Sequence, residues 1–129
     1  MNETFFQDNY PAGLAKTIDM NKYQSVIEVF NSFTEKFSSK PAFSCLGQTL
    51  TYSELESQSA AFAAYLQNET SLKPGDRIAV QLPNVLQYPI VVFGAMRAGM
   101  TVVNTNPLYT EREMEHQFND SGAKALVVL

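Results

Sequence analysis

The stretch that decides the fold is "RIAVQLPNVLQYPIVVFGAMRAGMTVVN", residues 77–104. It opens with a short run rich in Ile and Val, which is typical of a strand covered on both faces. Residues 84–99 follow at helical length, are apolar nearly all round, and end at a glycine suited to the position after a helix. A second strand is expected at 100–104. The stretch therefore predicts a strand, a buried helix and another strand parallel to the first.

The same alternation continues toward the end of the chain. Thr110 and Glu113 have the spacing of a capping box, so "NTNPLYTERE" predicts a loop followed by a helix. "ALVVL", residues 125–129, is a third strand candidate. Strand, helix, strand, helix, strand with short links predicts the α/β class, with a parallel sheet and right-handed crossovers. Pro89 predicts a kink or a delayed start in the first of these helices.

An irregular arm and a helix are expected before the sheet. Residues 1–24 show no sustained period, so we interpret them as an arm that a partner surface could order. The domain itself is expected to span residues 25–129. Ser25 and Glu28 have the spacing of a capping box. The helix that follows carries an apolar stripe at helical spacing: Val26, Val29, Phe30, Phe33 and Phe37.

A small hairpin and a second helix come next. Residues 42–52 are interpreted as two short strands around a type II′ turn at Gly47 and Gln48. Ser53 and Glu56 repeat the capping-box spacing and predict the start of the helix. Its buried side is expected to carry Leu55, Phe62, Ala63 and Leu66.

Composition limits the functions that the chain can have. Its 129 residues suit one domain, and 45% hydrophobic with 17% charged residues is typical of a globular protein. A net charge of −4 and the absence of a cluster of basic residues in the sequence argue against nucleic-acid binding. Cys45 is the only cysteine, so neither an internal disulfide nor a multi-cysteine metal site can form, and a reducing cytoplasm is the expected setting. The sequence shows neither a signal peptide nor a bilayer-spanning stretch.

Several residues that could carry chemistry have simpler structural interpretations. His116 is the only histidine and has no second metal ligand at a recognisable spacing. Glu111, Glu113 and Glu115 point in different directions on a helix, so capping and solvation explain them better than acid–base catalysis does. Cys45 has no basic neighbour in the sequence, and we interpret it as a small core residue rather than a nucleophile. The sequence therefore predicts no catalytic residue and no metal site.

The loop after residue 103 is the candidate for ligand contact. Asn104 and Asn106 follow the carboxyl end of a parallel strand, where ligands of open α/β sheets usually bind, and Tyr109 lies on the same loop. The sequence contains no G-x-G-x-x-G, G-x-x-x-x-G-K-[ST] or G-x-S-x-G motif. Asn104, Asn106 and Tyr109 are therefore the only ligand-side residues that we infer.

The second half of the chain resembles a known family. Residues 81–128, with "RAGMTVVNTNPLYTERE" as the most specific portion, closely resemble bacterial long-chain fatty-acid CoA ligases of the adenylate-forming superfamily. "LTYSELESQSAAFAAYL" and "GDRIAVQLPN" fit the same family in the same order, so the resemblance covers about residues 25–129. It implies an incomplete N-terminal subdomain of an acyl-CoA synthetase-like fold. It does not by itself fix an activity, because one fold hosts many functions.

The resemblance also implies a reaction for a parent enzyme. A fatty-acid carboxylate would attack the α-phosphate of Mg-ATP to give an acyl-adenylate and pyrophosphate, and the CoA thiol would then displace AMP. The family's phosphate loop, its aromatic-x-x-Thr-Glu segment and its catalytic lysine match no position here, so we expect the fragment alone to be inactive. The apolar strand at 125–129 lacks a covering element, which leads us to expect the beginning of a larger protein.

Partners follow from the resemblance, and one alternative stays open. Fatty acid, ATP, Mg²⁺ and CoA are the expected ligands of the parent, and none is expected to bind the fragment tightly. A homodimer through residues 1–24 and peripheral contact with the inner face of the cell membrane are further implications. The alternative is a self-contained flavodoxin-like binding module without enzymatic activity.

Overall fold

A three-stranded parallel sheet lies at the centre of the fold. The computed structural model describes residues 10–15 and 17–129. Strand β3 (Arg77–Gln81) lies between β4 (Thr101–Asn104) and β5 (Ala125–Val128), and both pairings are parallel. The sheet prediction is therefore confirmed, and β3, which comes first in the chain among the three strands of this sheet, lies in its middle.

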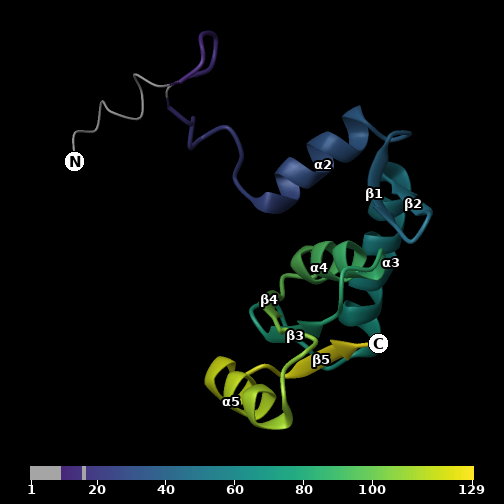
Figure 1. The fold of residues 1–129 in the computed structure, drawn as a ribbon, viewed down its shortest axis with the longest axis vertical. Helices are drawn as coiled ribbons and strands as arrows, with labels where there is room; N and C mark the ends of the chain where they lie inside the picture. Colours follow the sequence, from purple (N-terminus) through teal and green to yellow (C-terminus); the bar gives the residue numbers. More distant parts are fainter. Residues whose placement is uncertain (1–9, 16) are drawn as a thin grey trace.

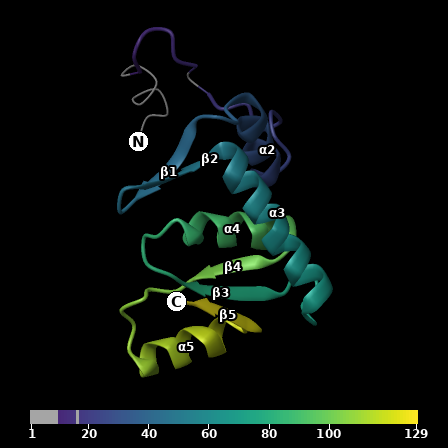
Figure 2. The same cartoon turned by 90° about the vertical axis from the view of Figure 1, so that its right-hand side faces the viewer.

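Helices cover the two faces of this sheet. Figures 1 and 2 show α4 (Gln87–Arg97) on one face and α5 (Glu111–Ser121) on the other. Helix α3 (Tyr52–Glu69) packs along α4, on the α4 side of the sheet. The chain thus leaves β3 toward one face and β4 toward the other, which is how a doubly wound sheet begins.

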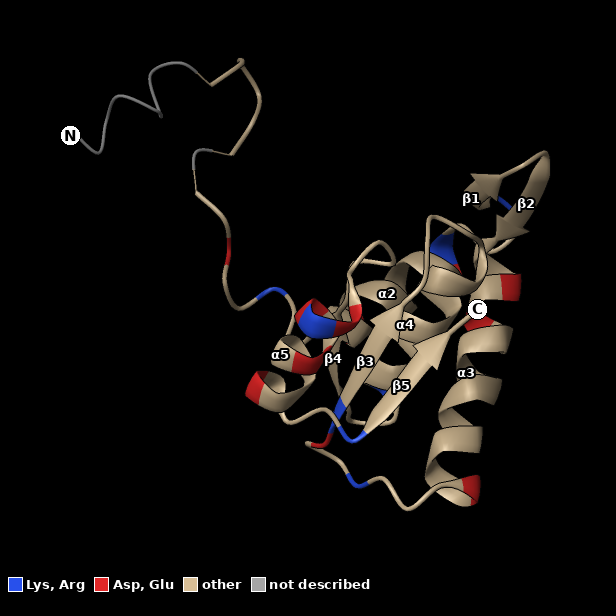
Figure 3. Ribbon diagram, turned by 60° about the horizontal axis from the view of Figure 1, so that its bottom comes forward, with Lys and Arg blue, Asp and Glu red and all other residues tan. Residues whose placement is uncertain are grey.

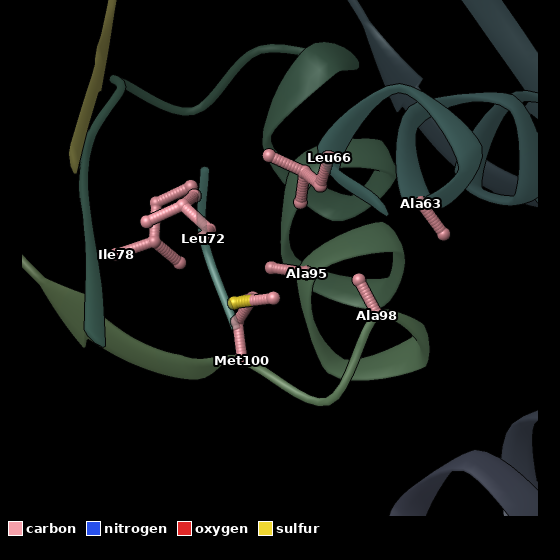
Figure 4. Close-up of a cluster of buried hydrophobic side chains, with 7 residues drawn as sticks. All are labelled: Ala63, Leu66, Leu72, Ile78, Ala95, Ala98 and Met100. Atoms are coloured by element: carbon pink, nitrogen blue, oxygen red, sulfur yellow. The ribbon is translucent and has the colours of Figure 1, made fainter. Parts of the chain in front are cut away.

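Small and branched apolar side chains fill the space between α3, α4 and the sheet. In β3, Ile78 and Val80 are each 1% exposed and Ala79 is fully buried, as expected for a strand covered on both faces. Figure 4 shows the main cluster, in which residues from α3, β3, α4 and the connecting loops meet. Its buried members are Ala63, Leu66, Leu72, Ile78, Ala95, Ala98 and Met100.

Helix α4 begins late and ends at a glycine, as the sequence predicts. It begins at Gln87, three residues after the predicted start, so that Pro89 is its third residue. A proline is tolerated there because the first amide groups of a helix have no partner within the helix. Gly99 follows the helix with φ +81°, a left-handed conformation that favours glycine.

Helix α2 (Val26–Lys36) confirms half of the predicted capping box and part of the predicted stripe, since the Glu28 carboxylate accepts from the Gln24 amide rather than from the Ser25 amide. The Ser25 hydroxyl accepts a hydrogen bond from the Glu28 amide at 3.1 Å. Phe30 is buried and stacks on Phe93 at a ring-centroid distance of 4.1 Å. Val26 and Phe33 are 59% and 41% exposed, so the stripe prediction is wrong for them, because α2 contacts the body over a narrower face than its sequence offers.

The cap of α3 was predicted two residues too far along the chain. Thr51, rather than Ser53, caps the helix, and the Glu54 carboxylate accepts hydrogen bonds from the Thr51 amide at 2.8 Å and the Thr51 hydroxyl at 2.7 Å. Glu56 instead forms an ion pair with Arg97 of α4 at 3.0 Å. Both pairs have the same spacing in the sequence, and the position of the preceding strand decides between them.

The hairpin prediction is right, but its turn is misplaced. β1 (Pro41–Cys45) pairs antiparallel with β2 (Gln48–Thr51), and Cys45 lies opposite Gln48. The two turn residues are therefore Leu46 and Gly47, with φ of 49° and 78°. Positive φ at both central positions indicates a type I′ turn rather than type II′.

Replacing Leu46 by asparagine is expected to stabilise the chain by about 1 kcal/mol. A left-handed conformation costs most residues roughly 1–2 kcal/mol, and asparagine tolerates it far better than leucine does. Little packing is lost, because Leu46 is 94% exposed. Urea unfolding should show a higher midpoint with an unchanged slope. Gly47→Ala at the next position should shift the midpoint the other way, and a lower midpoint for Leu46→Asn would contradict the turn assignment.

Candidate functional site

The carboxyl ends of β3 and β4 form the candidate site. β3 ends at Gln81 and β4 at Asn104, and the two strands are adjacent. The connections that follow lead to helices on opposite faces of the sheet (Figure 2). Ligands of open α/β sheets bind at such a switch point, outside the carboxyl ends of the strands. Strands β3, β4 and β5 carry no Asp or Glu, and in Figure 3 the acidic residues lie on other segments, among them α5 and the ends of α3.

Local hydrogen bonds shape the loop between β4 and α5. The Asn106 side-chain oxygen accepts from the Leu108 amide at 3.0 Å, and the Asn106 carbonyl accepts from the Tyr109 amide at 3.1 Å. The Glu113 carboxylate accepts from the Thr110 amide at 2.8 Å and from the Thr110 hydroxyl at 2.7 Å. The predicted capping pair is therefore confirmed, and most of this loop is explained by turn and helix formation.

Side chains from several elements converge on Asn104. The Tyr88 hydroxyl, from α4, donates to Asn104 Oδ1 at 2.8 Å, and Gln117 Nε2, from α5, donates to the Asn104 carbonyl at 2.9 Å. Gln81 Nε2, from β3, lies 3.1 Å from Met114 Sδ. Asn104 was predicted from the sequence, whereas Tyr88, Gln81 and Gln117 were not. A polar residue ending an otherwise buried strand, such as Gln81, was the one available signal.

Two buried polar atoms near this point have no hydrogen-bond partner within the part of the chain that the structure describes. They are Thr105 Oγ1 and Gln117 Oε1. Thr105 is only 4% exposed. Its amide donates to the Val80 carbonyl at 3.0 Å, whereas its hydroxyl is one of the two unpaired atoms. Buried polar groups are usually satisfied, so each exception in a protein requires an explanation.

A hollow of about 330 Å³ lies beside the strand end, between the hairpin and the connection from β3 to α4. Cys45 Sγ donates to the Asn84 carbonyl at 3.1 Å across this hollow, so the half-buried thiol ties the hairpin to the loop. Tyr88 lines the same hollow and thereby connects it to Asn104. The remaining lining is mainly apolar: Phe43, Ser44, Val85, Leu86 and Pro89.

The other candidates lie away from this site. His116 is exposed on α5, in a shallow depression with Arg112 and Asp120. Within residues 10–15 and 17–129, no group of three or more His, Cys, Asp or Glu side chains could hold a metal ion. The Thr110 hydroxyl, followed by the Thr110 amide, holds the pKa of the Glu113 carboxyl below its ordinary value of 4.5. Glu113 therefore acts as a cap.

Replacing Glu113 by glutamine is expected to weaken the pH dependence of stability. Because folding lowers the pKa of this carboxyl, its ionised form contributes stability above pH 4.5, which is lost as the pH falls through the lower folded-state pKa. Urea unfolding between about pH 7 and about pH 3 should show a difference between the two proteins that shrinks in acid. Glu115→Gln on the same helix is the control, and equal flattening by both variants would contradict the capping role.

Comparison with known proteins identifies the family. The family described as AMP-binding enzyme matches residues 30–129. The chain belongs to this family. Membership of the AMP-binding enzymes favours the prediction of an enzyme part over the alternative of a self-contained flavodoxin-like module. It also agrees with the doubly wound start of the sheet.

Individual relatives carry a more specific name. The long-chain-fatty-acid–CoA ligase of Haemophilus influenzae is 51% identical over 129 residues, which are 100% of this chain and 23% of that protein. The ligase of the same name from Salmonella typhimurium is 50% identical over 122 residues, which are 95% of this chain and 22% of that protein. The chain thus spans less than a quarter of the length of these curated relatives.

A solved structure confirms the fold prediction. The Klebsiella oxytoca NpsA N-terminal subdomain, in complex with 3-hydroxyanthranilyl-AMSN, is 28% identical, and the superposition has a TM-score of 0.77. It covers 81% of this chain and 26% of that chain. The α/β architecture of the present chain is therefore that of part of an N-terminal subdomain in this family.

Proposed function

We propose that these residues form the N-terminal part of a long-chain fatty-acid CoA ligase that activates fatty acids with ATP, releases AMP and transfers the acyl group to CoA. The observation that carries the proposal is the 51% identity to a ligase of that name over all 129 residues. Because the chain covers 23% of that relative, the activity belongs to a longer protein.

Within such an enzyme, this chain supplies scaffold and one ligand-side edge. Asn104, Asn106 and Tyr109 lie on the loop at the strand switch point, where substrate groups of the ligase would bind. The NpsA subdomain was solved in complex with 3-hydroxyanthranilyl-AMSN, which supports a ligand role for N-terminal subdomains of the family. ATP and CoA follow as co-substrates. Mg²⁺ would accompany ATP, but the residues described here do not fit a magnesium site, so we assign it no ligands on this chain.

The test compares the isolated chain with the full-length protein that carries it. Palmitate-dependent exchange between ATP and pyrophosphate is expected for the full-length protein and not for residues 1–129 alone. Exchange by the isolated residues would contradict the scaffold role. An inactive full-length protein that binds none of the three substrates would contradict the ligase itself.

We also propose that the arm, residues 1–24, contacts a second subunit. Part of it lies outside the described residues, and residues 10–15 and 17–24 form turns and bends. Leu14, Ile18 and Met20 in this segment are 61%, 84% and 81% exposed, which is costly for apolar side chains without a partner. Deleting the arm from the full-length protein should halve its mass in light scattering. An unchanged mass would refute the contact.

A cytoplasmic location with peripheral contact at the inner face of the cell membrane completes the proposal. No helix in the described part of the chain is long and apolar enough to cross a bilayer. Support for the contact comes from the substrate, since long-chain fatty acids partition into bilayers. Cosedimentation of the full-length protein with lipid vesicles tests it, and a protein that stays in the supernatant at every lipid concentration would contradict it.

A further inference from the structure

The hydrogen bonds of Asn104 fix which end of its side-chain amide faces the protein. Tyr88 donates to Asn104 Oδ1 at 2.8 Å and so takes one of the two acceptor positions of the amide oxygen. The Asn104 carbonyl is held separately by Gln117 at 2.9 Å. A side-chain amide also carries an NH₂ group with two donors, and this group is left for another partner. The exposed Asn104 side chain thus presents donors at the end of β4.

Asn106 is oriented in the same sense by a different partner. The Leu108 amide donates to Asn106 Oδ1 at 3.0 Å, so one acceptor position of this amide oxygen is used within the loop. Asn106 is exposed as well. Both asparagines therefore direct their amide oxygens to donors of the protein, and neither NH₂ group has a hydrogen-bond partner among the described residues. A site built in this way favours a ligand that brings hydrogen-bond acceptors.

The buried neighbour of Asn104 provides an independent observation. Thr105 is 4% exposed, and its hydroxyl has no hydrogen-bond partner among the described residues. Leaving such a group unpaired costs about 1–3 kcal/mol, so proteins keep few of them. Thr105 directly follows Asn104 in the chain, at the strand end where ligands of this architecture bind. The unpaired hydroxyl therefore marks this strand end as a place where a hydrogen-bond acceptor is missing.

We propose that Tyr88 is a positioning residue that turns the NH₂ group of Asn104 outward, and that Asn104 and Asn106 bind an anionic oxygen of the substrate, from a carboxylate or a phosphate. The inference rests on the proposed ligase function and adds a subsite and a ligand chemistry to it. The donors that Asn104 and Asn106 offer are neutral amide groups, so this subsite would recognise its ligand through neutral donors. Neutral donors bind such a group and release it more readily than a buried ion pair would.

The experiment measures steady-state kinetics of the full-length ligase with palmitate, ATP and CoA varied in turn. Asn104→Ala is expected to raise the KM of one substrate about tenfold or more, as for a lost hydrogen bond to a charged group. Tyr88→Phe should raise the same KM about fivefold with kcat within about twofold, because it frees the amide to turn. The palmitate arm reports a carboxylate, and the ATP and CoA arms report phosphates. Tyr65→Phe on α3, 54% exposed, is the control.

Two further variants separate positioning from a structural effect. The Tyr88→Phe/Asn104→Ala double variant should be no worse than Asn104→Ala alone, since Tyr88 acts through Asn104. Asn104→Asp keeps the shape and the acceptor for Tyr88 but replaces the NH₂ group by a carboxylate oxygen, and should raise the KM most by repelling an anion. Its folding is checked by thermal unfolding.

Several outcomes would overturn the inference. KM values within about twofold of wild type in Asn104→Ala and Asn104→Asp would exclude the subsite. Losses that multiply in the double variant would exclude positioning by Tyr88. A wild-type protein without ligase activity would overturn the proposed function, and the inference would fall with it, whereas an active wild type with unaffected variants overturns the inference alone.

Discussion

Replacing Gly94 by valine is expected to destabilise the chain by about 3 kcal/mol or more. Gly94 lies in α4 where this helix crosses α3, and a Cβ at this position would lie 2.8 Å from the Ser59 carbonyl oxygen and 2.8 Å from Phe62 Cδ1. The Phe62 ring can turn, but the Ser59 oxygen belongs to the backbone of a helix. The two helices would have to move apart, and the cluster beneath them would lose contacts.

A matched control separates this close approach from helix propensity. Ala64 is exposed on α3, and Ala64→Val adds a β-branched side chain to a helix where nothing packs against it. Its cost should stay below about 0.7 kcal/mol. Urea unfolding of both variants gives the comparison. Equal losses in the two variants would show that β-branching, rather than the α3–α4 contact, accounts for the effect.

The parallel sheet could be predicted because several independent features of the sequence indicate it. A run such as Arg77–Gln81 can be buried on both faces only between other strands, and the glycine at residue 99 marks the helix end independently of hydrophobicity. Several local signals thus predict the same fold.

The cap of α3 and the hairpin turn were predicted at the wrong residues, because no independent signals in the sequence agree on their positions. Thr51/Glu54 and Ser53/Glu56 have identical spacing, but β2 ends at Thr51, which places the cap there and leaves Glu56 to form the ion pair with Arg97. Leu46 takes a left-handed conformation that its side chain disfavours, because strand register places it in the turn. Neither choice is visible in a short sequence window, because each depends on where strands β1 and β2 pair and end.

The residues of the candidate site also fall into those that the sequence could predict and those that it could not. Asn104 was predictable, because a polar residue at the end of a strand of a parallel sheet is a local feature. Tyr88 was not, since the bond between its hydroxyl and Asn104 joins α4 to β4 and depends on how the helix lies on the sheet. Ser59 was missed for a related reason: a serine in a helix suggests exposure, yet it is fully buried where α3 meets Gly94. Contacts between elements could therefore not be predicted from the sequence pattern.

Replacing Leu55 by alanine is expected to cost about 3 kcal/mol and to loosen one part of the fold first. Leu55 is 1% exposed and belongs to a second core cluster, with Phe30 of α2 and Leu50 of β2. Truncation leaves a cavity between three elements. A hairpin of two strands is marginally stable by itself, so β1 and β2 depend on this cluster for their order.

Amide hydrogen exchange separates this local effect from a global one. In Leu55→Ala, amides of β1 and β2 should exchange faster, while those of β3 stay protected, because Ile78 and its neighbours form a separate cluster. Leu108→Ala, at a position 85% exposed, is the control and should change the free energy of unfolding by less than about 0.5 kcal/mol. Equal acceleration in the hairpin and in β3 would mean that the two clusters unfold as one unit. Leu55 would then stabilise the strand ends at Gln81 and Asn104 as much as it stabilises the hairpin.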